Sequence, residues 1–149
     1  ICIAPDVGGT ERARALGKLL GVGLAIVDKR RPAPGKSKVM NVIGNVKGKN
    51  CIIVDDIIDS GGTIVNAAKA LKDRGAKEVY VYITHGVLTG EAVEKIKKSV
   101  IKKLVITDTI DNTERVKSAK NIEVLTISNL MSEAIKRISN STSVSDLFK

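Results

Sequence analysis

An apolar run near the middle of the chain ends in a pair of carboxylates and a glycine-rich turn. Asp55 and Asp56 follow the apolar residues 51–54, and Asp59 directly precedes Ser60-Gly61-Gly62-Thr63. Backbone N–H groups and hydroxyls at the start of a helix bind phosphate, because the helix dipole places positive charge there. Carboxylates beside such a loop suit sugar hydroxyls or a hydrated divalent cation. The stretch therefore predicts a ligand with a phosphate at one end and a diol at the other, such as a sugar phosphate.

A second glycine-rich loop, Asp6-Val7-Gly8-Gly9, follows the first predicted strand. Adjacent glycines let the backbone approach a bound anion closely, and Asp6 is a candidate ligand for a metal ion or for sugar hydroxyls. A Gly-Gly loop between a strand and a helix is more often structural, so both interpretations stay open here. For the Asp55–Thr63 stretch the alternative is a buried strand with an ordinary polar turn.

A basic segment follows the second predicted strand. Residues 28–38 contain five basic side chains, among them Lys29 and Arg31, together with two prolines and a glycine. Such a composition predicts a loop, and a solvated surface loop is the usual outcome for a run of charge. In open parallel sheets, however, ligands bind beyond the carboxyl ends of the strands. Cations on a loop at such an end could close over phosphates during phosphoryl transfer. His85, at the end of another strand, is either a further substrate contact or a loop histidine with a local partner.

Hydrophobic periodicity predicts alternating strands and helices, which indicates a doubly wound α/β fold with a mostly parallel sheet flanked by helices. The expected strands are residues 1–4, 24–27, 39–44, 51–54, 78–84, 103–107 and 122–127. The expected helices are residues 11–20, 63–74, 91–98 and 128–138. Thr10 is expected to cap the first helix, and the last helix is expected to pack inward through Leu130, Met131, Ala134, Ile135 and Ile138.

Length and composition narrow the function classes. A chain of 149 residues with 43% hydrophobic and 28% charged residues is expected to form one globular domain. Its net charge of +9 favours anionic partners, but aromatic residues make up only 2%, so stacking platforms for single-stranded nucleic acid are lacking. We expect small phosphorylated ligands and no nucleic acid. No apolar run approaches the ~20 residues of a membrane span, and we expect a cytoplasmic protein. Both cysteines, Cys2 and Cys51, lie in apolar strand-like runs and are expected to be buried and unpaired.

Several ordered segments together resemble one enzyme family, ribose-phosphate diphosphokinase, also called phosphoribosyl diphosphate synthetase. The segments are Pro5–Gly9, Val27–Pro32, Asp55–Thr63, Thr84–Gly90 and Ser143–Phe148. The resemblance implies a type I phosphoribosyltransferase fold. It also implies that residues 1–149 form a single domain, the C-terminal half of a two-domain enzyme whose N-terminal half is absent from this sequence. The implied reaction transfers the diphosphate of ATP to the anomeric hydroxyl of ribose 5-phosphate with Mg²⁺.

The resemblance also assigns roles to residues. It implies that the 5-phosphate is cradled by Asp59, Ser60, Gly61, Gly62 and Thr63, and that the ribose hydroxyls are held by Asp55 and Asp56. The implied diphosphate loop consists of Asp6, Val7, Gly8 and Gly9, with Asp6 also at the metal. Lys29 and Arg31 are implied to be catalytic, and a regulatory phosphate site at subunit contacts is implied for Arg12, Ser143, Val144 and Ser145. The family further implies a homo-oligomer based on dimers, up to a hexamer. Another type I phosphoribosyltransferase and a non-catalytic regulatory homologue are the alternatives.

Overall fold

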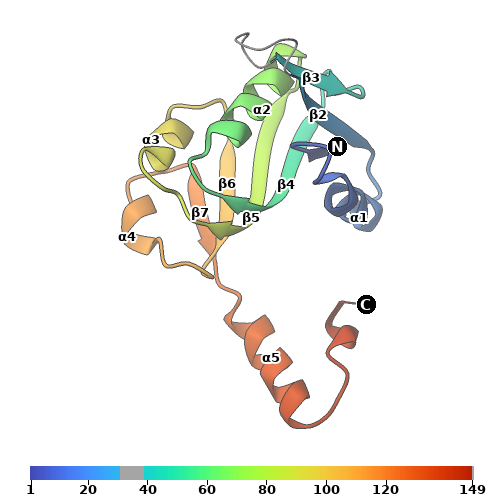
Figure 1. Cartoon of the computed structure of the whole chain (residues 1–149), viewed down its shortest axis with the longest axis vertical. Helices are drawn as coiled ribbons and strands as arrows, with labels where there is room; N and C mark the ends of the chain where they lie inside the picture. The colour runs from blue at the N-terminus through green and yellow to red at the C-terminus, as the bar shows by residue number, and fades with distance from the viewer. Residues whose placement is uncertain (31–38, 149) are drawn as a thin grey trace.

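The fold is built on one mostly parallel sheet. The computed structural model describes residues 1–30 and 39–148, and within them seven strands form the sheet in the order β3-β2-β1-β4-β5-β6-β7 (Figure 1). The strands are β1 (Cys2–Ala4), β2 (Leu24–Arg30), β3 (Val39–Ile43), β4 (Asn50–Ile58), β5 (Glu78–Gly86), β6 (Lys103–Thr107) and β7 (Ile122–Leu125). The β2–β3 pair is antiparallel and the other pairs are parallel. The predicted α/β class and mostly parallel sheet are therefore confirmed.

The helices are α1 (Thr10–Leu20), α2 (Gly62–Asp73), α3 (Ala92–Lys97), α4 (Thr113–Val116) and α5 (Ser128–Ser139), followed by a short 3-10 helix, η1 (Ser145–Phe148). Four of the helices, α1, α2, α3 and α5, occur where the periodicity predicts them. The β1–α1–β2 unit extends the sheet in one direction, and the β4–α2–β5 unit extends it in the other. Because parallel crossovers are right-handed, α1 and α2 lie on opposite faces of the sheet, which makes the fold doubly wound.

The core lies between α2 and the central strands. Ile64, Ala67, Ala68 and Leu71 recur at helical spacing along α2, and each is at most 3% exposed. On the other face, α1 approaches the sheet through small residues, Ala13 and Gly17, which are buried. A Cβ atom at Gly17 would lie 3.1 Å from the carbonyl oxygen of Val22, so a larger residue would push α1 away from the sheet.

The sheet order reverses between β1 and β4, so the two glycine-rich loops leave the sheet side by side. β1 pairs with β4 through Cys2↔Ile52 and Ile3↔Ile53. The loop after β1 leads into α1, and the loop after β4 leads into α2. In doubly wound sheets this topological switch point opens a crevice at the carboxyl ends of the strands. The topology therefore brings the two predicted anion loops to one edge of the sheet.

Local expectations differ from the structure in several places. β2 continues to Arg30 and pairs with β3, so residues 28–30 belong to a strand and not to the predicted basic loop. β4 continues to Ile58, so Asp55 and Asp56 lie within the strand instead of following it. Thr10 does not cap α1, because Gly9 is the N-cap residue and the Thr10 hydroxyl donates to the Val7 carbonyl. The short helix α4 and the helix η1 have too few turns for their periodicity to be recognised in the sequence.

The expected inward packing of α5 is wrong. α5 contains no buried residue, and Leu130, Met131, Ile135 and Ile138 are between 44% and 67% exposed. Figure 1 shows α5 extending away from the sheet beyond the end of β7. The apolar spacing correctly predicted an amphipathic helix, but spacing cannot identify which surface covers the apolar side.

Two other expectations concern the cysteines and membrane spans. Cys2 and Cys51 are free and buried, as expected, and burial raises the pKa of both thiols. Within residues 1–30 and 39–148, no helix combines the length and the apolar character needed to cross a membrane.

Candidate functional site

The predicted phosphate loop forms an open helix N-terminus. Gly61 adopts φ 76° and ψ −8°, a left-handed conformation that glycine reaches without a Cβ clash, and α2 begins at Gly62. No side chain of the described residues caps this end of α2. The N–H groups of its first turn therefore remain available to an anion, where the helix dipole also favours negative charge.

A polar groove beside this loop provides room for a ligand. Its volume is about 550 Å³. Ser60, Gly62 and Thr63 line it at the start of α2, and Asn66 and Lys69 continue the lining along the helix. Two hydroxyl groups and an uncapped helix end thus line the same space and suit a phosphate. Lys69 is paired at 3.0 Å with Asp73, which also lines the groove.

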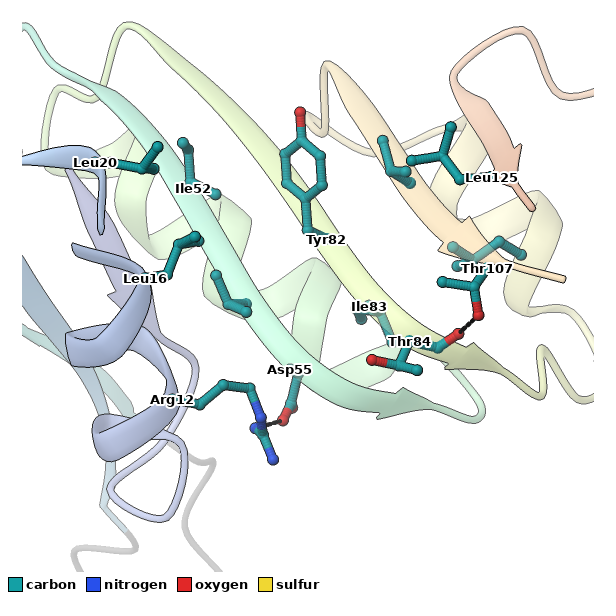
Figure 2. A pocket seen from close by; sticks show the side chains of 13 residues that line it. Arg12, Leu16, Leu20, Ile52, Asp55, Tyr82, Ile83, Thr84, Thr107 and Leu125 are labelled. Atoms are coloured by element: carbon teal, nitrogen blue, oxygen red, sulfur yellow. Dashed lines mark hydrogen bonds and ion pairs between the residues drawn. The ribbon is translucent and has the colours of Figure 1, made fainter. Parts of the chain in front are cut away.

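The two carboxylates of β4 are joined by one arginine. Arg12 Nη1 lies 2.7 Å from Asp55 Oδ1, and Arg12 Nη2 lies 2.8 Å from Asp56 Oδ2. Asp55 Oδ1 also accepts the backbone N–H of Asp56 at 3.0 Å. Figure 2 shows Arg12 reaching from α1 to Asp55 on β4. The structure therefore places Arg12 at the candidate sugar site, whereas the resemblance had connected it with a regulatory site.

The two carboxylates differ in their electrostatic environment. The Asp55 side chain is 21% exposed and that of Asp56 is 59% exposed. Burial raises the pKa of Asp55 above its ordinary value, and the adjacent Asp56 charge acts in the same direction. Desolvation also acts on Asp56, but the Arg12 charge and a hydrogen bond with Asp55 keep the pKa of Asp56 below its ordinary value. Asp56 is thus the more firmly ionised member of the pair.

The loop after β1 is a compact turn held by Asp6. The Gly9 N–H donates to Asp6 Oδ1 at 2.9 Å, and the Thr10 hydroxyl donates to the Val7 carbonyl at 2.7 Å. A Cβ atom at Gly8 would lie 3.3 Å from Asp6 Oδ1. Gly8 and Gly9 do not have positive φ angles, so their absent side chains serve close packing here.

The described part of the chain contains no cluster of three or more acidic, histidine or cysteine side chains placed to hold a metal ion. The assignment of Asp6 to a metal stays a prediction.

Asp59 contacts the neighbouring loop after β5. The Thr89 hydroxyl donates to Asp59 Oδ1 at 2.5 Å, and the Thr89 N–H donates to the Asp59 carbonyl at 3.2 Å. The Leu88 N–H donates to the Ile58 carbonyl at 3.2 Å, while Leu88 is fully buried with φ 53°. These bonds fix the backbone directly before the phosphate loop, so the structure gives Asp59 a structural contact in addition to its predicted role.

A buried polar contact supports the loop after β5 and was not recognised in the sequence. Asn112 is 2% exposed and donates from Nδ2 to the carbonyl oxygens of Gly86 and Ile110. Arg115 donates to the carbonyl oxygens of Val87 and Leu88. Asn112 and Arg115 have no motif spacing relative to the glycine-rich stretch, and only the folded sheet brings them together.

Replacing Thr89 by valine should lower the free energy of unfolding by about 0.5 to 1 kcal/mol, because the substitution removes the hydroxyl that binds Asp59 but keeps the shape of the side chain. Urea denaturation of the wild type, Thr89→Val and Thr89→Ser would measure the effect. Serine restores the hydroxyl and should recover most of the loss. Equal stabilities of the valine and serine variants would contradict this role of the hydroxyl.

Other predicted residues lie elsewhere or outside the described part. Arg31 and the Lys29 side chain are outside the described residues, so their catalytic assignment stays a prediction. The His85 ring Nδ1 lies 2.9 Å from Thr109 Oγ1, which gives this histidine a local partner. In the tail, Arg137 donates to the carbonyl oxygen of Ser143 at 2.9 Å. The Ser143, Val144 and Ser145 segment lies beside α5 and apart from α1 (Figure 1). Because the resemblance places the regulatory site at contacts between subunits, its assignment to this segment and Arg12 stays a prediction.

A second, apolar groove runs from Arg12 across the face of the sheet. Its volume is about 640 Å³. Leu16 and Leu20 of α1 line one side, and Tyr82 and Leu125 line the other (Figure 2). Tyr82 is 42% exposed and Leu125 is 47% exposed, so this face of the sheet lacks a helix layer over β5 to β7 in the described chain.

Comparisons with known proteins agree with the resemblance seen in the sequence. A family model described as the phosphoribosyl synthetase-associated domain matches residues 27–149. The ribose-phosphate pyrophosphokinase of Hyphomonas neptunium is 60% identical over 149 residues, which make up 99% of this chain and 48% of that protein. The chain therefore spans about half the length of the curated relatives it matches.

Solved structures agree with the fold. The crystal structure of phosphoribosylpyrophosphate synthetase from Mycobacterium smegmatis aligns with a TM-score of 0.85 at 35% identity, over 94% of this chain and 45% of that one. Purine phosphoribosyltransferase from Pyrococcus horikoshii aligns with a TM-score of 0.51 at 22% identity, over 85% of this chain and 74% of that one, and shows likeness of fold alone. The chain belongs to the phosphoribosyl synthetase-associated domain family and has a phosphoribosyltransferase-like fold.

Proposed function

We propose that this chain is the sugar-phosphate-binding part of a ribose-phosphate pyrophosphokinase, an enzyme that transfers the diphosphate of ATP to the anomeric hydroxyl of ribose 5-phosphate. The observation that carries the proposal is the pairing of Asp55 and Asp56 with an uncapped α2 N-terminus at the switch point of the sheet. This arrangement supplies donors for a phosphate and acceptors for hydroxyls at one edge. The names of the relatives support the same substrate.

Each group of residues has a chemical role in this proposal. The N–H groups of Gly62 and Thr63, with the Ser60 hydroxyl, bind the 5-phosphate. Asp55 and Asp56 accept hydrogen bonds from the ribose hydroxyls and so orient the anomeric carbon. The loop residues Val7, Gly8 and Gly9 would bind the diphosphate through their backbone, and the Gly9 N–H, which donates to Asp6 in this structure, would have to exchange that partner to contribute. Cations from the Lys29–Arg31 segment would stabilise the charge on the transferring group.

Magnesium fits the Asp6 loop as a shared ion. One oxygen of Asp6 holds the turn through the Gly9 N–H, and a carboxylate can bind an ion through its other oxygen. Mg²⁺ in nucleotide sites is commonly held by one or two carboxylates, substrate phosphates and waters. Asp6 would thus supply one hard oxygen ligand. When bound, the ion would neutralise charge on the diphosphate. Magnesium, a cytoplasmic location, ATP as a partner and a homo-oligomer remain parts of the proposal.

Ribose 5-phosphate binding and product formation test the proposal separately. Isothermal titration calorimetry should detect ribose 5-phosphate binding by this chain, with no AMP formed on addition of ATP, because the chain has about half the length of the curated relatives. In a second experiment, this chain replaces the matching segment of the full-length Hyphomonas neptunium relative. The resulting exchanged protein should still form AMP from ATP and ribose 5-phosphate.

Two results would contradict the proposal. AMP formation by the isolated chain would contradict the need for a separate nucleotide-binding part. A well-folded exchanged protein that forms no AMP, but releases diphosphate in the presence of a nucleobase, would instead assign the chain to a phosphoribosyltransferase. As a control, the same exchange with Asp55→Asn and Asp56→Asn together should abolish AMP formation while the protein remains folded.

A further inference from the structure

The two neighbouring carboxylates of the sugar site would be expected to diverge. Asp55 and Asp56 lie within β4, and successive side chains of a strand point to opposite faces of the sheet. Each also carries negative charge, so mutual repulsion favours separation. In the structure, however, both carboxylates bind one guanidinium, at 2.7 Å and 2.8 Å. Arg12 therefore bridges both carboxylates, in addition to the hydrogen bond that joins Asp55 and Asp56 directly.

The guanidinium is suited to this contact in a way that an ammonium is not. Arg12 uses its two terminal nitrogens, Nη1 for Asp55 and Nη2 for Asp56, in one planar fork. Its position is set by α1, because the adjacent Ala13 is fully buried against the sheet. The side chain of Arg12 is 39% exposed, so part of it is shielded from water. A lysine at this position has one nitrogen and cannot span both carboxylates in the same geometry.

The remaining carboxylate oxygens form a pair of acceptors. Arg12 engages Asp55 Oδ1 and Asp56 Oδ2, which are one oxygen of each group. Asp55 Oδ2 and Asp56 Oδ1 are not used by these contacts. Two carboxylates that share one guanidinium can each offer an oxygen to one of two hydroxyls on neighbouring carbons of a sugar. Inorganic phosphate has no such diol, so this pair can discriminate a sugar phosphate from phosphate alone.

We propose that Arg12 is a positioning residue that sets the preference of this site for ribose 5-phosphate over inorganic phosphate, by holding Asp55 and Asp56 together as one diol-binding pair. This inference rests on the proposed sugar-phosphate function. It assigns to Arg12 an effect on the sugar end of the ligand and none on the phosphate end, where the α2 N-terminus binds.

Calorimetric titrations with ribose 5-phosphate and with inorganic phosphate would test the inference on the whole chain and three variants. Arg12→Gln removes the fork, Arg12→Lys keeps the charge without the fork, and Arg14→Gln is a control with the same loss of charge at an exposed position on α1. The preference is the ratio of the two dissociation constants. Circular dichroism and thermal unfolding would establish that each variant is folded.

We expect Arg12→Gln to reduce this preference about fivefold with the phosphate affinity nearly unchanged, as loss of a well-formed ion pair implies. Arg12→Lys should give an intermediate preference, and Arg14→Gln should behave as the wild type. A folded Arg12→Gln protein with wild-type preference, or with equal losses for both ligands, would overturn the inference and leave the proposed function standing. A wild-type chain without any preference for ribose 5-phosphate would overturn the proposed function itself, and the inference with it.

Discussion

Replacing Gly61 by alanine should lower the affinity for ribose 5-phosphate about tenfold, because Gly61 holds the phosphate loop in a left-handed conformation with φ 76°. For a residue with a Cβ atom this region costs about 1–2 kcal/mol, and about 1.4 kcal/mol corresponds to a tenfold change in an equilibrium. Crowding adds little, since the new Cβ would lie 3.7 Å from the Ala92 Cβ. The strain favours other loop conformations, in which the N–H groups of α2 no longer converge on the phosphate.

Gly48→Ala is the matched control for this substitution. Gly48 has φ 71° and lies in the turn before β4, and a Cβ atom added there would have no neighbour within 4 Å. Its replacement should carry a similar backbone strain but leave ribose 5-phosphate affinity unchanged. Calorimetry on both variants would separate the local role of Gly61 from a general loss of stability. Equal affinities of Gly61→Ala and the wild type would show that the loop does not bind the phosphate.

Replacing Leu71 by alanine should lower the free energy of unfolding by about 3 kcal/mol, within the range of about 2–5 kcal/mol for buried leucines. Leu71 is fully buried on the side of α2 that packs on the sheet, so its loss leaves a cavity in the core. Urea denaturation would measure the change. Leu19→Ala is the control, because Leu19 is 84% exposed and its replacement should change stability by less than about 0.5 kcal/mol. Similar losses for the two variants would contradict the described core.

The sequence predicts the layers of this fold well because its signals are local. Ile64, Ala67, Ala68 and Leu71 repeat at helical spacing, and all four are buried in α2. The apolar run that begins at Cys51 forms the inner part of β4. A run of branched apolar residues favours a buried strand, and glycine-rich turns separate strand from helix. These preferences act within a few residues and need no knowledge of distant contacts.

The contacts that organise the site depend on residues that are distant in the sequence. Arg12 meets Asp55 and Asp56 across 43 and 44 positions, and Thr89 meets Asp59 across 30. Nothing in the spacing of Asn112 indicates that it binds the Gly86 carbonyl. Similarly, the apolar positions of α5 predict a helix but do not reveal that the described chain leaves its apolar side exposed. Sheet topology brings such residues together, and it is a property of the whole fold.

The central claim is that the edge formed by β4 and the start of α2 binds ribose 5-phosphate. Titration of the ¹⁵N-labelled chain with ribose 5-phosphate, followed by two-dimensional NMR, tests this claim most directly. We expect the largest shifts at the backbone N–H groups of Ser60 to Thr63 and of Asp55 and Asp56, and inorganic phosphate should shift the Ser60–Thr63 group alone. Saturable shifts centred on another surface, or no shifts at millimolar ligand, would contradict the claim.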